Sequence, residues 1–454
     1  MKKWNILYGT LFFAACLVPS LGMISGDGER SSENRELAKL PEFIGEDGLN
    51  PEFLKEAGEY FQDHFAYRNQ LVTANALVMG KGFGVSAADG VIQGTDGWLY
   101  YKDSLNDYQG VELMSGRSIF NVAHTLRLMQ DYVEKNGCAF LFAAAPNKNT
   151  LYGEHMPYYD QVCTGKESNL DRLTEQLEAE GVSFVDLKSV FQQQEEVLYH
   201  KRDSHWNNRG ASLAADAMLD ALGKLHISYI NGDYEVRKDF IGDLDKMLYP
   251  EALTPEEEIY YEKGFSWSYV EEVENNFAPR ISTTGNLASG SLVMYRDSFG
   301  NALLPFLAEA YGKAYFSRGI PYQLTDLDAC QADTVIVERA ERFLPEMAEN
   351  PPVMEGALAI VPETAQVLEG EELKNGTCSS QGMYTKLSGT IDSEKLEETS
   401  RIYVQNGMMA YEAFPVTNAD GMEGFVLYVE NGKLPVMEDG TGLADGVRFC
   451  ISQN

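Results

Sequence analysis

Asp203 and His205 stand two residues apart in a polar segment that precedes an amphipathic pattern. A carboxylate beside an imidazole can orient it as a general base, provided that the segment carrying both is held rigidly. Apolar residues recur at helical spacing from 211 to 222, and Gly223 is a typical helix stop. The Asp-x-His-Trp segment therefore predicts a catalytic pair positioned by a helix. The alternative interpretation is a surface turn whose polar residues only cap that helix.

Ser298 is the nucleophile that such a base would activate. It lies between the apolar run at 291–295 and a helical pattern that begins near residue 300. A hydroxyl is a poor nucleophile at neutral pH, so it needs a base, and the base needs an orienting acceptor. Unpaired N–H groups at a helix N-terminus can also stabilise a developing oxyanion. Taken alone, Ser298 is more typical of a helix cap; taken with Asp203 and His205, it predicts an acyl-transfer triad.

The elements that must bring these residues together are alternating strands and helices. Apolar runs at 138–145, 182–186, 291–295, 314–316 and 334–338 are separated by helical patterns. Continuous apolar strands of this kind are typical of a mostly parallel sheet with helices on both faces. Ligands bind such α/β sheets at the carboxyl ends of their strands. We therefore predict an α/β catalytic domain over 117–350, with a Tyr- and Glu-rich insertion at 224–290 that frames the site.

The two ends of the chain have a different character. Lys2 and Lys3 precede an uncharged run that ends at Ile24, which predicts a signal anchor over 1–24 with the body outside the cytoplasm. Residues 25–116 read as a juxtamembrane connector and a helical and aromatic segment. Within it, Asp63, His64 and Arg68 resemble a second acid–base site, but a structural salt bridge is the favoured interpretation. Short alternating runs after 351 predict a small β domain over 351–454.

Composition excludes several classes of function. The formal net charge of −33 argues against a nucleic-acid partner and disfavours a strongly anionic polymer, unless a local basic groove overrides it. None of the six cysteines forms a Cys-x-x-Cys pair, so we predict no metal site and no cofactor. Cys378 and Cys450 bracket the C-terminal segment; a disulfide between them and two separate thiols are both open.

Several short motifs occur together in one order. They are ENRELAKLPEF (33–43), YFQDHFAYRNQL, GWLYY (97–101), AAPNKNTLY, DSHW (203–206), FIGDLDKML (240–248), MYRDSFGNALLPFL (294–307) and VIVERAERFL. In this combination residues 33–345 resemble the SGNH-hydrolase-like O-acetyltransferases of the alginate AlgJ/AlgX type, also called DHHW proteins. The resemblance implies that Asp203, His205 and Ser298 form the triad, in the chain order acid, base, nucleophile.

The resemblance also implies a reaction. Members of this family act outside the cytoplasm and attach acetyl groups to secreted polysaccharides, with a membrane-bound O-acyltransferase delivering the acetyl group. The expected function is thus O-acetylation of an extracytoplasmic polysaccharide or cell-wall glycan through an acetyl-serine intermediate. Two alternatives stay open: an acetyl-ester hydrolase that uses the same triad, and a catalytically silent glycan-binding partner of the membrane enzyme.

Three features bear on how far the family's pattern carries over. Arg296 stands where a glycine often precedes the Asp-Ser pair, and it could alter the backbone path or bind a carbonyl. Lys148 and Asn149 could supply further oxyanion donors. The C-terminal β domain could bind carbohydrate through exposed aromatic residues, although a plain β core is the favoured use of most of them. The candidates are Tyr384, Tyr403, Tyr411 and Tyr428.

Overall fold

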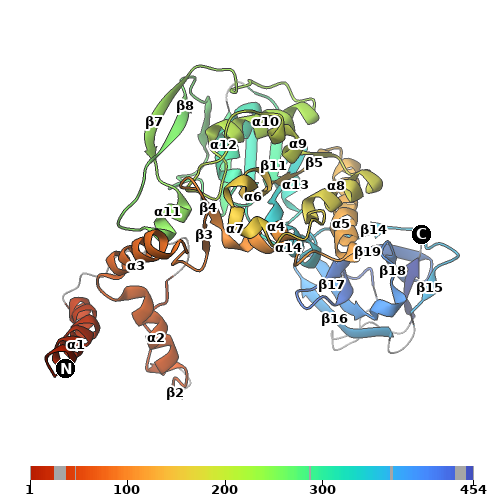
Figure 1. Cartoon of the computed structure of the whole chain (residues 1–454). Helices are drawn as coiled ribbons and strands as arrows, with labels where there is room; N and C mark the ends of the chain where they lie inside the picture. The colour runs from red at the N-terminus through yellow and green to blue at the C-terminus, as the bar shows by residue number, and fades with distance from the viewer. Residues whose placement is uncertain are drawn as a thin grey trace.

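The middle of the chain folds around a mixed β-sheet (Figure 1). The computed structural model describes residues 2–24, 37–45, 48–285, 288–368, 372–434 and 446–452. Within these residues the sheet has seven strands, in the spatial order β6-β5-β13-β11-β12-β10-β9. They are β5 (Ala139–Ala145), β6 (Phe184–Val185), β9 (Trp267–Tyr269), β10 (Arg280–Gly285), β11 (Ser291–Tyr295), β12 (Lys313–Ser317) and β13 (Thr334–Ala340). The strands from β6 to β12 run parallel, whereas β10 and β9 join antiparallel at one edge.

The central strands are buried on both faces. In β11, Leu292 and Met294 belong to one hydrophobic cluster, whereas Val293 and Tyr295 belong to the other. Successive side chains of a strand point to opposite faces, so an apolar strand without alternation must be covered twice. Helices α5 and α8 cover one face, and α9, α10 and α12 cover the other. The predicted α/β class, a mostly parallel sheet between two helical layers, is confirmed.

These helices begin and end close to where the sequence predicted. Their bounds are α5 (Gly116–Lys135), α8 (Asn169–Glu180), α9 (Leu187–Gln192), α10 (Asn208–Ala221) and α12 (Gly300–Ala310). The side chain of Asn207 accepts a hydrogen bond from the Gly210 N–H and caps α10. Gly223 follows that helix with a φ of 61°, a conformation that favours glycine. Helix α10, which begins three residues after His205, thus has a defined start and a defined end.

Residues 224–290 contribute to the sheet as well as to the surroundings of the site. They supply its two antiparallel edge strands, β10 and β9. They also form the hairpin of β7 (Tyr234–Phe240) and β8 (Glu256–Tyr261), with helix α11 (Asp243–Leu248) between them. Helix α11 contacts helix α3 and the hairpin of β3 (Val91–Gln93) and β4 (Leu99–Tyr101). The stretch expected to be an insertion is therefore partly integral to the fold.

The N-terminal helices extend from one side of the sheet (Figure 1). They are α1 (Lys2–Ile24), α2 (Phe53–His64) and α3 (Arg68–Phe83). Among the described residues, no helix has the combination of length and apolarity that a membrane span requires. The expected single-pass anchor over 1–24 is therefore wrong. Met1 and the connector residues 25–36 lie outside the described residues.

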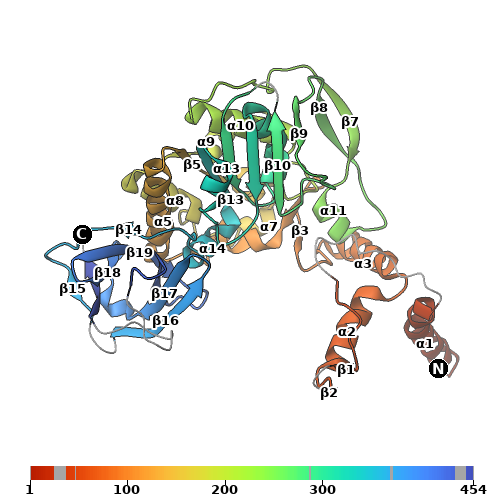
Figure 2. The same cartoon turned by 180° about the vertical axis from the view of Figure 1, so that it is seen from behind.

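A curled antiparallel sheet follows the α/β body on the side opposite to the N-terminal helices (Figure 2). Its strands are β14 (Ala357–Leu358), β15 (Gln366–Val367), β16 (Leu373–Gln381), β17 (Tyr384–Ile391), β18 (Arg401–Asn406), β19 (Met409–Thr417), β20 (Glu423–Glu430) and β21 (Val447–Ser452). Tyr384, Phe414 and Tyr428 share one hydrophobic cluster with residues of α5 and of helix α14 (Leu344–Glu349). The two parts are therefore joined through a common apolar core.

The tyrosines proposed for glycan binding are part of that core. Tyr384, Tyr403, Tyr411 and Tyr428 are all buried, with at most 5% of each side chain exposed. They cannot stack against a sugar from these positions, so the favoured interpretation as a β core holds. Cys378 and Cys450 are both free thiols, so the disulfide alternative is excluded.

Candidate active site

Ser298 lies in the turn between β11 and α12, at the carboxyl edge of the parallel strands. The carboxylate of Asp297 holds this turn: it accepts hydrogen bonds from the N–H groups of Phe299 (2.9 Å) and Ala340 (2.7 Å). Because Ala340 ends β13, the turn is tied to the neighbouring strand. Helix α12 has no side-chain cap, and its N-cap residue is Phe299. The Ser298 hydroxyl is therefore not used as a helix cap.

His205 and Asp203 meet Ser298 in one hydrogen-bonded row. His205 Nε2 lies 2.8 Å from Ser298 Oγ, and His205 Nδ1 lies 2.8 Å from Asp203 Oδ1. With the Nδ1–H donating to Asp203, Nε2 is free to accept the serine proton. The structure thus brings together the three residues singled out from the sequence, although 93 residues separate His205 from Ser298.

Two buried side chains fix the loop that carries Asp203 and His205. The Lys148 ammonium donates to the backbone carbonyls of His200 (3.1 Å) and Lys201 (3.0 Å) and also to that of Asp203. Trp206 is only 2% exposed, and its ring packs edge-on against Phe299 at 4.8 Å between centroids. Such an aromatic pair contributes about 1 kcal/mol of stability in addition to the energy gained by burying the two rings. The segments that carry His205 and Ser298 are therefore coupled by packing as well as by a hydrogen bond.

Helix α11 adds a second carboxylate, Asp243, to this row. Its backbone N–H donates to Asp203 Oδ2 at 2.8 Å, and its side chain accepts from Ser204 N (2.8 Å) and Ser204 Oγ (2.6 Å). Asp243 Oδ2 also lies 3.6 Å from His205 Nδ1. The imidazole therefore faces two carboxylates on its Nδ1 side, and Asp203 is held by hydrogen bonds on both oxygens.

These contacts shift the acid–base properties of the site. Burial alone would lower the pKa of His205, but the hydrogen bond and charge of Asp203, with the charge of Asp243, raise it. Burial would raise the pKa of Asp203, but the hydrogen bond and charge of His205 lower it. Burial and the neighbouring Asp203 raise the pKa of Asp243. The arrangement favours an imidazolium that forms when His205 accepts a proton.

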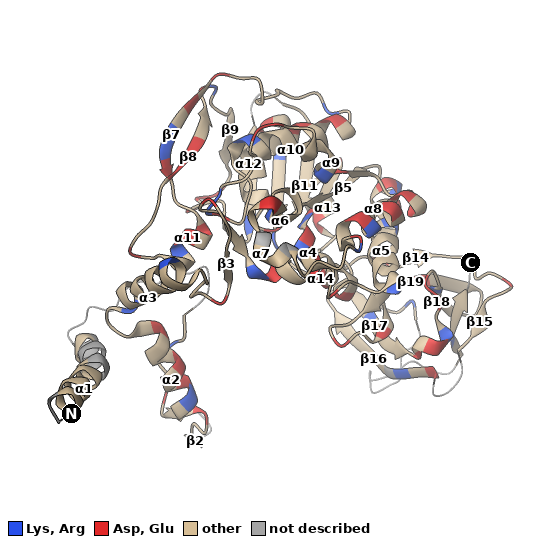
Figure 3. Cartoon of the chain, viewed as in Figure 1, with Lys and Arg blue, Asp and Glu red and all other residues tan. Residues whose placement is uncertain are grey.

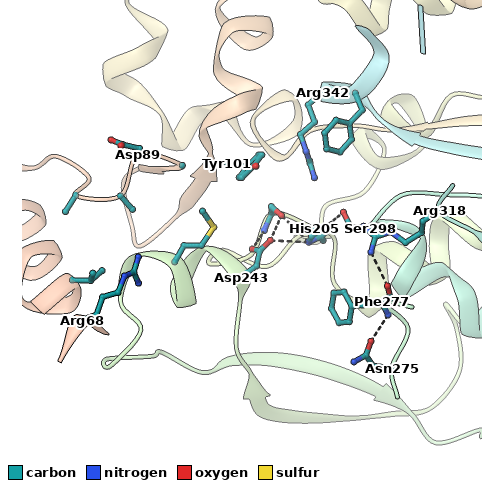
Figure 4. Close-up of a pocket in the computed structure, with 17 residues that line it drawn as sticks. Arg68, Asp89, Tyr101, His205, Asp243, Asn275, Phe277, Ser298, Arg318 and Arg342 are labelled. Carbon is teal, nitrogen blue, oxygen red and sulfur yellow. Dashed lines mark hydrogen bonds and ion pairs between the residues drawn. The ribbon is translucent and has the colours of Figure 1, made fainter. Parts of the chain in front are cut away.

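A pocket of about 1020 Å³ opens over Ser298 and His205 (Figure 4). Arg68 and Asp89 lie at one end of the view, and Arg318 and Asn275 lie at the other. Tyr101, Asp243 and Arg342 line the middle, near His205 and Ser298. A pocket of this size accommodates several sugar units.

Three arginines and two aspartates line this pocket, although the chain as a whole is strongly acidic. Acidic side chains are spread over α2, α8 and β8 elsewhere on the molecule (Figure 3). The pocket lining therefore has one more basic than acidic side chain, in contrast to the acidic excess of the whole chain.

The accessory residues considered from the sequence have other partners. Arg296 is buried, and its guanidinium donates to the carbonyls of Asn276 (2.9 Å) and Ala278 (3.2 Å), so it fixes that loop. Asn149 donates to the Ser104 carbonyl at 3.2 Å. Neither of them lines the pocket, and Lys148, with its three carbonyl partners, does not line it either. None of the three is placed to contact a reacting carbonyl.

Asp63, His64 and Arg68, the second acid–base candidate, each contact a backbone group. Asp63 accepts a hydrogen bond from the Ala38 N–H at 2.9 Å, and His64 Nδ1 contacts the Tyr60 carbonyl at 2.9 Å. Arg68 donates to the Gln62 carbonyl at 3.0 Å and lines the far end of the pocket. A structural role, which the sequence favoured, agrees with these contacts for Asp63 and His64.

Asp243 and Arg342 were not assigned a role from the sequence. Both occur in motifs that carry the family resemblance: Asp243 in FIGDLDKML and Arg342 in VIVERAERFL. Arg342 follows β13, which neighbours β11, so strand order alone could have placed it at the same sheet edge as Ser298. Asp243 had no such signal, because α11 reaches the site only through tertiary packing.

Asp203, His205 and Asp243 also form a group whose ligand atoms lie within 4.8 Å of one another. Such a group could hold a cation. A cation there would take the Nδ1 side of the imidazole and replace its hydrogen bond to Asp203. The observed hydrogen bonds suit a triad better than a metal centre.

Comparison with known proteins supports the family resemblance. Residues 91–251 match the family model described as the SGNH hydrolase-like domain of the acetyltransferase AlgX. This range contains Asp203, His205 and Asp243, and it ends before Ser298. The resemblance to SGNH-hydrolase-like O-acetyltransferases, inferred from the motifs, is confirmed over this range.

Two curated relatives are described as "Probable alginate O-acetylase AlgJ". That of Pseudomonas putida is 25% identical over 241 residues, which is 51% of this chain and 56% of that protein. That of Pseudomonas syringae pv. tomato is 27% identical over 182 residues, 39% of this chain and 44% of that protein. The chain thus spans about half the length of the curated relatives it matches. A solved DHHW family protein from Eubacterium siraeum covers 56% of this chain and 91% of its own, with 16% identity and a TM-score of 0.42.

Proposed function

We propose that this chain, whose residues 91–251 match the AlgX-type SGNH hydrolase-like domain, is a serine-dependent O-acetyltransferase acting on a polysaccharide. Ser298 is the nucleophile, His205 the general base and Asp203 the residue that orients the base. The observation that carries the proposal is the unbroken row of hydrogen bonds from Asp203 through His205 to Ser298, at 2.8 Å each, at the wall of a pocket.

In the first half-reaction Ser298 Oγ attacks the carbonyl carbon of an acetyl donor. His205 Nε2 takes the hydroxyl proton, and the imidazolium is stabilised by Asp203 and Asp243. The tetrahedral intermediate collapses with the C–O bond to the donor breaking, and the proton on His205 passes to the leaving oxygen. The product is an acetyl ester on Ser298.

In the second half-reaction a sugar hydroxyl takes the place of the donor. His205 accepts its proton while the hydroxyl oxygen attacks the acetyl carbon, and Ser298 leaves with that proton. Alginate is the polymer named for the curated relatives, and the arginines in the pocket suit an acidic sugar of this kind. A membrane-bound O-acyltransferase as the source of the acetyl group, and an acceptor outside the cytoplasm, stay predictions of the resemblance.

The test is the turnover of an activated acetyl ester such as 4-nitrophenyl acetate. Ser298→Ala and His205→Ala should each lower kcat by at least about 10³-fold, because members of a triad act as a unit. Asp203→Asn should retain more activity, since the amide keeps part of the hydrogen bond. Adding a polysaccharide acceptor separates acetyl transfer from hydrolysis through the fraction of acetyl groups recovered on sugar.

Ser291→Ala is the matched control. Ser291 is a buried serine at the start of β11 whose hydroxyl donates to the Cys330 carbonyl at 2.9 Å, away from the pocket. Its loss should cost about 1 kcal/mol of stability and leave kcat unchanged. Equal turnover by wild type and Ser298→Ala, with circular dichroism unchanged, would refute the proposal and favour a glycan-binding role.

A further inference from the structure

The triad described above leaves one requirement of acyl transfer unassigned. When Ser298 attacks, the carbonyl oxygen of the acetyl group takes a full negative charge, and a donor must stabilise it. Lys148 donates to three backbone carbonyls, Asn149 to the Ser104 carbonyl and Arg296 to two loop carbonyls. The polar groups of these three side chains are therefore committed to other partners.

Arg342, unlike these three side chains, faces the pocket with its guanidinium uncommitted to any described polar group. It lies in the short 3₁₀ turn η3 (Glu341–Phe343) directly after β13 and lines the pocket together with Ser298 and His205. Among the residues that the structure describes, none forms a hydrogen bond or an ion pair with its guanidinium, and its Nε is buried without a partner. In a chain with 69 acidic and 36 basic side chains, a half-buried arginine without a carboxylate is unusual.

Aromatic rings hold this guanidinium in place. Its Cζ lies 5.1 Å from the ring centroid of Phe299, 4.9 Å from that of Phe343 and 5.3 Å from that of Tyr101. The Phe299 ring also lies 4.8 Å from the His205 ring, so Arg342 and His205 contact the ring of the residue next to the nucleophile. Figure 4 shows the Arg342 side chain directed from its turn toward His205 and Ser298. Cation–π contacts fix the cation without occupying its N–H groups.

We propose that Arg342 is the oxyanion donor of this enzyme. This inference rests on the proposed function, because it assigns the charge that the Ser298 attack creates. The guanidinium N–H groups donate to the carbonyl oxygen of the acetyl group, first as the donor ester and again as the acetyl-serine ester. No atom is transferred to or from Arg342: the charge forms on the oxygen as the C–O bond to Ser298 or to the acceptor forms, and it disappears on collapse.

The test uses 4-nitrophenyl acetate with water as the acceptor. This ester carries no carboxylate and no sugar, so a loss of rate cannot come from weaker binding of an acidic acceptor. Arg342→Gln should lower kcat by about 10²-fold with little change in KM, because the interaction forms only in the transition state. Arg342→Lys should retain part of the rate, and millimolar guanidinium should partly restore the activity of Arg342→Ala.

A second readout is the pH dependence of kcat/KM. The charge of Arg342 opposes protonation of His205, whereas Asp203 and Asp243 favour it. Removal of the cation should therefore move the acidic limb of the profile to higher pH, which a loss of structure alone would not do.

Arg339→Gln is the matched control. Arg339 lies in β13 three residues earlier and also packs over Phe343, at 4.7 Å, but it is paired with Glu346 and does not line the pocket. It should keep the wild-type kcat and the wild-type pH profile. If Ser298→Ala is inactive while Arg342→Gln turns over at the wild-type rate, the triad stands and the oxyanion role of Arg342 is refuted. If Ser298→Ala is active, the proposed function itself fails.

Discussion

At the scale of single residues, the most informative side chain is the second carboxylate beside the imidazole of His205. Asp243 Oδ2 lies 3.6 Å from His205 Nδ1, and its charge contributes to the raised pKa of His205. His205 must be neutral to accept the Ser298 proton, so activity should rise with pH through the pKa of His205. In the proposed mechanism Asp243, together with Asp203, therefore raises the lower pH limit of activity.

Asp243→Asn should move the acidic limb of the kcat/KM profile to lower pH, because one of the two carboxylates whose charges raise the pKa of His205 is removed. The amide oxygen can still accept from Ser204, so kcat at high pH should change little. The measurement is the rate of acetyl-ester hydrolysis across the pH range, for wild type and variant. An acidic limb that stays in place would show that Asp243 only caps the loop.

At the scale of elements, helix α11 reaches the site because its first turn lies directly against the Asp203 loop. A Cβ at Gly242 would lie 2.1 Å from the carbonyl oxygen and 2.4 Å from the carbonyl carbon of Arg202. Both are backbone atoms, so no rotamer change can relieve the contact. The absence of a side chain at Gly242 is what lets the Asp243 N–H donate to Asp203.

Gly242→Ala should therefore displace α11 and weaken both catalysis and stability. We expect a loss of about 1–3 kcal/mol of unfolding free energy, as for other overpacked sites, and a fall in kcat of about tenfold. Denaturant unfolding and acetyl-ester turnover measure the two effects. Gly264→Ala is the control, because a Cβ there meets no atom within 4 Å; equal behaviour of the two variants would contradict the close approach.

At the scale of the whole molecule, a buried histidine joins the catalytic body to the C-terminal sheet. His124 of α5 contacts Glu180 of α8 through Nδ1 (2.8 Å) and Glu412 of β19 through Nε2 (2.9 Å). Arg401 of β18 lies 3.8 Å from Glu180 and 3.9 Å from Glu412. Burial would lower the pKa of His124, but its two carboxylate partners raise it. The imidazolium thus bridges elements from both parts.

This bridge predicts a pH-dependent stability. Because the pKa of His124 in the folded state lies above its ordinary value of 6.5, the contribution is complete below that pH. It is lost as the pH rises through the raised pKa. His124→Gln should cost about 3 kcal/mol at about pH 6, since it leaves two half-buried carboxylates without their imidazolium partner, and less at about pH 9. Denaturant unfolding of both proteins at both pH values measures this; a cost independent of pH would refute it.

The sequence by itself determined the layers of the fold and singled out the three candidate residues of the site. The apolar run of β11 requires a sheet that is covered on both faces. Its neighbouring residues, such as Leu292 and Val293, point to opposite faces, and both are apolar and need burial. Asp203, His205 and Ser298 were identifiable because each stands beside a helix or strand pattern that is local in the chain. Periodicity and capping act over a few residues, so they can be read directly.

Only the tertiary structure decided which further side chains reach Ser298 and which do not. Lys148 and Arg296 are cations that could stabilise an oxyanion, but they donate their hydrogen bonds to backbone carbonyls instead. Arg342 and Asp243 enter the pocket because β13 lies beside β11 and because α11 docks without a Cβ at Gly242. The first helix looks apolar in the sequence, but no helix among the described residues is long and apolar enough to cross a membrane. The free energy of each of these contacts depends on distant partners, and no local pattern encodes them.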